Sequence, residues 1–189
     1  LPYSQAKEDL LAKVAKAQNA LDEIQVNAAT EAVNALFNGD TPKPENTQEQ
    51  IDAAKAKVDA LANSDAKTAL LAKITTAQNA LNAEVEKENA ATEAVNALFN
   101  GDTPKPENTQ EQINAAKAKV DALTNETVKT ALLAKITAAQ QALDEATEEA
   151  AKVQAATEAV NALFNGDTPK PENTQEQINA AKAKVDALK

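Results

Sequence analysis

The residue types that most often carry chemistry are scarce in this sequence. It has no Cys, His, Met or Trp, and Lys supplies all 19 of its basic residues. Zinc and soft metals need Cys, His or Met ligands, and catalysis near neutral pH usually recruits His or a base beside a nucleophile. The aromatic residues that an apolar pocket needs number only four. The sequence therefore predicts a protein that is not an enzyme, with no catalytic residues, no cofactor and no metal site.

One loop, NGDTPKPENT, offers oxygen ligands and occurs three times without variation. Its first copy contains Asp40, Glu45 and Asn46, but their spacing does not match a calcium-binding EF-hand loop. Pro42 and Pro44 bias the residues before them away from helix. We interpret the loop as a stiff connector between helices, and calcium binding or recognition of a partner as the alternatives.

The net charge of −10 and the absence of Arg count against nucleic acid as a partner, because nucleic-acid binding needs clustered basic residues. No run of 18 apolar residues is present, and no basic amphipathic face is available to lie on a membrane. We therefore expect no nucleic-acid partner and no membrane insertion.

The elements that would position any site are set by internal repeats. Residues 28–61, 90–123 and 155–188 are identical except at Asp52, Asn114 and Asn179. A second similar block covers residues 10–21, 70–81 and 132–143. The chain therefore divides into three repeats, 1–61, 62–123 and 124–189, each with a long helix and a short helix. Three-helix bundles are expected to straddle these boundaries, at 27–88 and 89–153.

Three kinds of residue are predicted to hold each repeat together. A glycine after Leu-Phe-Asn is expected to form a left-handed helix C-cap. A phenylalanine on the last helical turn is expected to pack under the following loop, with an exposed anchor for a partner as the alternative. A threonine followed three residues later by Gln is expected to open the short helix with a capping box. These structural residues are Gly39, Gly101, Gly166, Phe37, Phe99, Phe164, Thr47, Thr109 and Thr174.

No Gly or Pro interrupts residues 4–37, 65–99 or 127–164, so each segment is predicted to be one long helix. The short helix carries Ile51, Ala54 and Val58, and the long helix carries Leu70, Ile74 and Ala77, at the spacing of a buried stripe. The predicted fold is all-α: tandem three-helix bundles joined by continuous long helices into a spectrin-like elongated rod. An α-solenoid is the alternative.

The motifs EAVNALF (first copy Glu31–Phe37), IxAAKAKVDAL and LLAKITxAQxAL resemble the helical repeats related to domain VI of insecticidal crystal toxins. Such repeats occur in tandem in cell-wall-anchored surface proteins of Gram-positive bacteria. The resemblance implies a secreted protein displayed at the cell surface, in the cell wall, with the repeats forming a stalk. It brings no catalytic residues with it.

The predicted function is that of a non-catalytic structural repeat region, an elongated stalk or spacer of a bacterial cell-surface protein. The alternative is a multivalent helical binding module, an adhesin for a host or matrix protein, in which repeated faces gain avidity. A monomer is expected, because the apolar stripes should be used up by packing within the chain.

Overall fold

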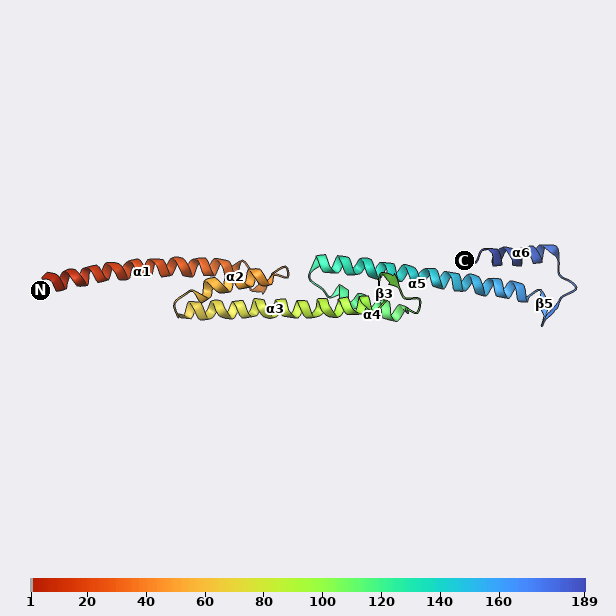
Figure 1. The fold of residues 1–189 in the computed structure, drawn as a ribbon, viewed down its shortest axis with the longest axis horizontal. Helices are drawn as coiled ribbons and strands as arrows, with labels where there is room; N and C mark the ends of the chain where they lie inside the picture. Colours follow the sequence, from red (N-terminus) through yellow and green to blue (C-terminus); the bar gives the residue numbers. More distant parts are fainter. Residues whose placement is uncertain (1) are drawn as a thin grey trace. The chain divides into compact units, whose positions relative to one another are not determined.

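The computed structural model describes residues 2–189, so the first residue of the predicted first repeat lies outside it. The described chain has six α-helices, and a two-stranded hairpin follows each of the three long ones (Figure 1). The chain is 73% helical, which confirms the all-α fold class. The helices are α1 (Pro2–Asn34), α2 (Gln48–Asp59), α3 (Asp65–Asn96), α4 (Gln110–Asp121), α5 (Glu126–Asn161) and α6 (Gln175–Asp186). The strands are β1 (Phe37–Asn38), β2 (Thr41–Pro42), β3 (Phe99–Asn100), β4 (Thr103–Pro104), β5 (Phe164–Asn165) and β6 (Thr168–Pro169).

The three long helices confirm the prediction of continuous helices through the Gly- and Pro-free segments. Helices α1, α3 and α5 contain 33, 32 and 36 residues. Each ends three residues earlier than predicted, at Asn34, Asn96 and Asn161. The segment that follows each of these helices forms a hairpin, and this hairpin was not predicted.

The glycine after Leu-Phe-Asn has the predicted left-handed conformation, but it lies in that hairpin turn and not at the helix C-cap where it was predicted. After α1 the chain makes a tighter turn, in which the Leu36 amide donates to the Val33 carbonyl at 3.0 Å. Strand β1 then pairs antiparallel with β2. Gly39 has φ +62°, and no other residue type has a positive φ in the described chain. Positive φ at the first of two turn residues is typical of a type II′ turn, which suits the twist of a hairpin.

Packing divides the chain into two compact units, one of residues 1–89 with 123–126 and one of 90–122 with 127–189. In the first unit, the second half of α1, the whole of α2 and the first half of α3 form a three-helix bundle around one core (Figure 1). The buried apolar side chains of that core are Ala29, Val33, Leu36, Phe37, Ile51, Ala54, Val58, Leu61, Leu70, Ile74 and Ala77.

The second unit repeats this bundle with the end of α3, the whole of α4 and the first half of α5. Its buried apolar side chains include Ala91, Val95, Leu98, Ile113, Ala116, Val120, Leu132, Ile136 and Ala139. Helix packing of this kind buries one stripe per helix, and the observed stripes have the predicted spacing of three and four residues. The second unit also contains a two-helix hairpin, made by the second half of α5 and α6.

Candidate functional site

The repeated loop is held closed by an asparagine that the sequence analysis treated only as a candidate oxygen ligand. The Asn46 side chain is 8% exposed, and its amide nitrogen donates to the Leu36 carbonyl at 2.8 Å. Asn108 and Asn173 donate at the same distance to the carbonyls of Leu98 and Leu163. The side-chain amide is therefore a second donor to a carbonyl that also accepts from the Lys43 backbone amide at 2.9 Å, and the two bonds close the loop. Within residues 2–189, no cluster of three or more Asp or Glu residues is arranged to hold a metal ion.

Phe37 and Phe99 pack against the third helix of their own bundle. Phe37 is 8% exposed and belongs to the core of the first unit. The Lys73 Nζ atom lies 5.7 Å from the centre of its ring, and Lys135 Nζ lies 5.9 Å from the centre of the Phe99 ring. Both distances are within the range of a cation–π interaction. Phe164, in the two-helix hairpin, is 36% exposed.

The threonines open the short helices through reciprocal hydrogen bonds. The Thr47 hydroxyl accepts from the Gln50 amide at 3.3 Å, and the Gln50 side chain accepts from the Thr47 amide at 2.9 Å. Thr109 and Thr174 make the same capping box at α4 and α6. These bonds satisfy amides that the first turn of a helix leaves without partners.

A polar contact that the sequence analysis missed joins each of two long helices to the residues after a short helix. Glu84 of α3 is 8% exposed, and its Oε1 atom accepts from the backbone amides of Thr124 and Asn125, at 2.5 and 3.2 Å. Glu149 of α5 accepts from the Lys189 amide at 2.7 Å. Both glutamates stand eleven residues before the valine of the EAV motif, and this shared spacing is the signal that sequence reasoning could have used.

The electrostatics of Glu84 follow from these contacts. Burial raises the pKa of its carboxyl, but hydrogen bonds from Thr124 and Asn125, together with the charge of Lys87, outweigh burial and lower the pKa below the ordinary value of 4.5. Glu148 of α5 lies one helical turn before Lys152 on an exposed face. The hydrogen bond and charge of Lys152 likewise lower the pKa of the Glu148 carboxyl. Both shifts have structural causes: hydrogen bonds and a neighbouring lysine.

Two kinds of concave surface lie beside these residues. A depression of about 340 Å³ lies between the first repeated loop and α3. It is lined by Thr41, Pro42, Lys43, Pro44, Asn46, Ala80, Leu81, Ala83, Glu84, Lys87 and Thr124. The second kind, which we call the alanine groove, lies between a long helix and a short helix and measures about 230 Å³ in both units.

The alanine groove recurs in both units with identical side chains. In the first unit it is lined by Ala32, Ala35, Leu36, Gln50, Ala53, Ala54 and Lys57. In the second unit the equivalent residues are Ala94, Ala97, Leu98, Gln112, Ala115, Ala116 and Lys119. The lining is apolar except for a glutamine and a lysine in each unit, which suits a binding surface.

No helix in residues 2–189 is long and apolar enough to span a membrane.

The bundles, hairpins and capped short helices define a class of protein, the all-α tandem repeat of three-helix bundles. The chain belongs to the family described as domain IV of the pesticidal crystal protein Cry1Aa, whose model matches residues 24–83 and 86–145. The match confirms the resemblance to crystal-toxin repeats, with the domain numbered IV and not VI. Each matched segment runs from one long helix through a short helix into the next long helix. No curated protein and no solved structure matches the chain.

Proposed function

We propose that this chain is a non-catalytic spacer, the stalk of a bacterial cell-surface protein. One observation carries the proposal: the recurring Gly, Asn, Thr and Phe residues of the loop and its flanks form contacts within their own repeat or bundle. Gly39 shapes a turn, Asn46 and Thr47 bond to the backbone, and Phe37 fills the core. Residues kept for an outside ligand would instead point away from the repeat that carries them.

The tandem motifs resemble repeats of Gram-positive surface proteins. This resemblance supports one part of the proposal, the placement at the cell surface in the cell wall of a Gram-positive bacterium. A stalk needs length, solubility and tolerance of copy number. The net charge of −10 favours solubility, and near-identical repeats favour tolerance of copy number.

Small-angle X-ray scattering tests the spacer directly. If the bundles stack along one axis, three long helices end to end give a maximum dimension on the order of 130–160 Å. A compact chain of this length would have a radius of gyration of about 16 Å. A rod-like profile at monomer mass supports the spacer, and a compact profile would rule it out.

The alternative function, a multivalent binding module for a host or matrix protein, is favoured by the alanine groove. Because the groove has the same lining in two units, a partner with repeated features would find two equivalent sites. Binding to both sites together would be tighter than binding to one. The seven lining residues also occur in the third repeat, as Ala159, Ala162, Leu163, Gln177, Ala180, Ala181 and Lys184.

Capture from plasma or matrix extract separates the two functions. The test variant carries Ala53→Glu, Ala115→Glu and Ala180→Glu, three exposed alanines that line the groove or its third equivalent. The matched control carries Glu at the exposed Ala56, Ala118 and Ala183, which are outside the groove. Capture lost only in the test variant supports the binding module, and no capture by the unmodified chain leaves the spacer.

A further inference from the structure

The repeated hairpin places an asparagine directly before its turn glycine. Asn38 and Gly39 are both exposed, and so are Asn100 and Gly101 in the second unit. An asparagine side-chain amide can be attacked by the backbone nitrogen of the next residue, which closes a five-membered succinimide ring and releases ammonia. Glycine at the next position favours this attack, because it has no Cβ to hinder it. The dipeptide Asn-Gly occurs three times in the sequence, each time in this loop.

Two features of the structure leave the reacting groups of the hairpin accessible. Within residues 2–189, the Asn38 side chain and the Gly39 amide have no hydrogen-bond partner. No other part of the chain lies within 4 Å of the position that a Cβ of Gly39 would take, so the ring has room to form. By contrast, the Asn46 side chain of the same loop is buried and donates to the Leu36 carbonyl at 2.8 Å. Asn38 is therefore the asparagine of this loop that is suited to the reaction.

The closed hairpin nevertheless holds the reacting atoms apart. Strand pairing sets Asn38 opposite Thr41 and Phe37 opposite Pro42. A paired strand residue has an extended backbone, which directs the following amide nitrogen away from the side chain of that residue. The Gly39 nitrogen reaches the Asn38 Cγ atom only when the backbone of Asn38 leaves this conformation. The reaction therefore requires the hairpin to open.

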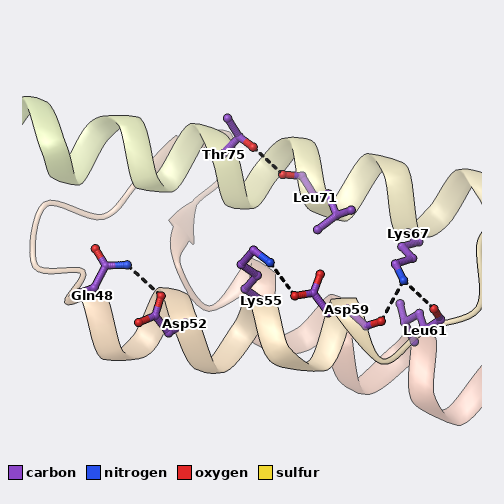
Figure 2. Close-up of polar contacts among 8 residues, drawn as sticks. All are labelled: Gln48, Asp52, Lys55, Asp59, Leu61, Lys67, Leu71 and Thr75. Carbon is purple, nitrogen blue, oxygen red and sulfur yellow. Dashed lines mark hydrogen bonds and ion pairs between the residues drawn. The ribbon is translucent and has the colours of Figure 1, made fainter.

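The short helix after the hairpin has attachments of its own to the bundle. Where α2 begins, Gln48 and Gln78 of α3 exchange two side-chain hydrogen bonds, at 2.7 and 2.8 Å. Where α2 ends, the Lys67 ammonium of α3 donates to the carbonyls of Asp59 and Leu61, at 2.9 and 2.8 Å (Figure 2). These contacts do not involve the hairpin, so α2 can stay in place when the hairpin opens.

Few bonds have to break for the hairpin to open. Besides the two strand pairs, the loop is closed by two hydrogen bonds to the Leu36 carbonyl, from the Lys43 amide at 2.9 Å and from the Asn46 side chain at 2.8 Å. The second unit has the same two bonds, to the Leu98 carbonyl. Exposed segments held by few contacts open locally while the rest of the structure stays folded. Hairpin opening is therefore an event within one repeat.

We propose that Asn38 and Asn100 are sites of spontaneous deamidation, and that the opening of their hairpins sets the rate. In the open hairpin the Gly39 nitrogen loses its proton and bonds to the Asn38 Cγ atom. The bond from Cγ to the side-chain nitrogen breaks, and this nitrogen takes up a proton and leaves as ammonia. Water then hydrolyses the succinimide. Opening of the ring at one carbonyl gives aspartate, and opening at the other gives isoaspartate, whose side-chain carbons lie in the main chain.

The products change the repeat that carries them. Each event replaces a neutral amide with a carboxylate, so the repeat gains one negative charge. Isoaspartate also lengthens the main chain by one carbon between Phe37 and Gly39, so β1 and β2 can no longer pair in the observed register. The loop would then no longer close beside Phe37, which is 8% exposed. Long-lived chains would therefore acquire charge and lose hairpins one repeat at a time.

A time course at physiological temperature, with the full chain digested by trypsin and analysed by mass spectrometry, tests the proposal. The tryptic peptides 17–55 and 88–117 carry the two sites and differ in sequence, so each site is measured separately. A synthetic peptide of residues 35–46 gives the rate without a folded hairpin. We expect both sites to react in the folded chain, at least about tenfold more slowly than in the peptide. Alkaline pH should accelerate both reactions, because the attacking nitrogen must lose its proton.

Two substitutions in the first unit separate hairpin opening from the chemistry of the turn. Asn46→Ala removes one hydrogen bond that closes the loop, so the hairpin should open more often and Asn38 should react about fivefold faster. Gly39→Ala also loosens the turn, but its Cβ hinders the attack, so Asn38 should react several-fold more slowly. Asn100 lies in the other unit and should keep its rate in both variants.

Glu45→Ala is the matched control, since Glu45 is the exposed neighbour of Asn46, and it should leave the rate at Asn38 unchanged. Circular dichroism checks that each variant folds. If Asn46→Ala does not fold, the Gly39→Ala variant and the comparison with the peptide still decide. The proposal is overturned if Asn38 stays intact in the folded chain while the peptide is fully converted, or if chain and peptide react at the same rate. It is also overturned if Asn46→Ala and Glu45→Ala have equal effects, or if Gly39→Ala accelerates the reaction.

Discussion

Among single residues, Glu84 shows how a buried carboxylate can stabilise a joint without taking part in chemistry. It accepts hydrogen bonds from two backbone amides between α4 and α5, where the backbone groups at helix ends have no partner within their own helix. Glu149 accepts one such hydrogen bond, from the Lys189 amide, which indicates that the acid belongs to the repeat and not to one bundle. In the first repeat the equivalent residue is Asp22, which is one methylene shorter.

Replacing Glu84 with Gln should lower the free energy of unfolding by about 1–2 kcal/mol at neutral pH, because a neutral amide oxygen is a weaker acceptor for two backbone amides. The folded pKa of Glu84 is lowered, so its contribution is present above 4.5 and is lost as the pH falls through the folded pKa. Thermal unfolding at a series of pH values measures this. The gap between E84Q and the unmodified chain should close on acidification.

Glu86→Gln is the control, since Glu86 is an exposed acid of the same helix. A gap that persists unchanged at low pH would show that the carboxylate charge of Glu84 is not the source of the stabilisation.

The turn glycine gives a second prediction at this scale. An added Cβ at Gly39 would meet no atom within 4 Å, so the cost of Gly39→Ala comes only from its φ of +62°. We expect the substitution to lower the free energy of unfolding by about 1 kcal/mol, as measured by denaturant titration. Asp40→Ala, at the neighbouring turn position with negative φ, should cost little. Equal costs would mean that the turn geometry is not the constraint.

At the scale of elements, the sequence predicted what depends on periodicity and caps. The stripes of α2 and α3 and the threonine caps follow from local rules, which act over four residues and can be read from the chain. The hairpin after each long helix was not predicted, because two-residue strands leave no periodic pattern. Its evidence is non-local: the Lys43 amide bonds to the Leu36 carbonyl, and Asn46 bonds to the same atom.

The repeats provide a natural experiment on packing. Val58, Val120 and Val185 occupy the same position in α2, α4 and α6, but their exposures are 0%, 0% and 45%. Replacement by Ala should therefore cost roughly 2 kcal/mol at the first two positions and less than about 1 kcal/mol at Val185. Denaturant unfolding of the three variants gives the comparison. A cost at Val185 equal to the others would contradict the incomplete bundle.

At the scale of the whole molecule, the two compact units share a helix but not a core. The boundary falls within α3, whose first half packs in one bundle and whose last turns pack in the other. Stability in repeat proteins of this kind is a sum of local terms with coupling between neighbours.

Amide hydrogen exchange on the Val58→Ala variant measures that coupling. We expect faster exchange in α2 and in the first half of α3, because the cavity lies in their core. Exchange in α4 should change little. If α4 exchanged faster by the same factor, the two units would open together and the division into separate bundles would fail as a description of stability.

The straddling of repeat boundaries by the bundles has a genetic consequence. Each bundle draws two helices from one repeat and the third from the next, and the contacting side chains are nearly the same each time. Deleting residues 62–123 by unequal crossing-over would bring Leu132, Ile136 and Ala139 against α2 in place of Leu70, Ile74 and Ala77. These replacements are identical in type. The gene can therefore lose or gain whole repeats in a single recombination event, with no new core left to evolve.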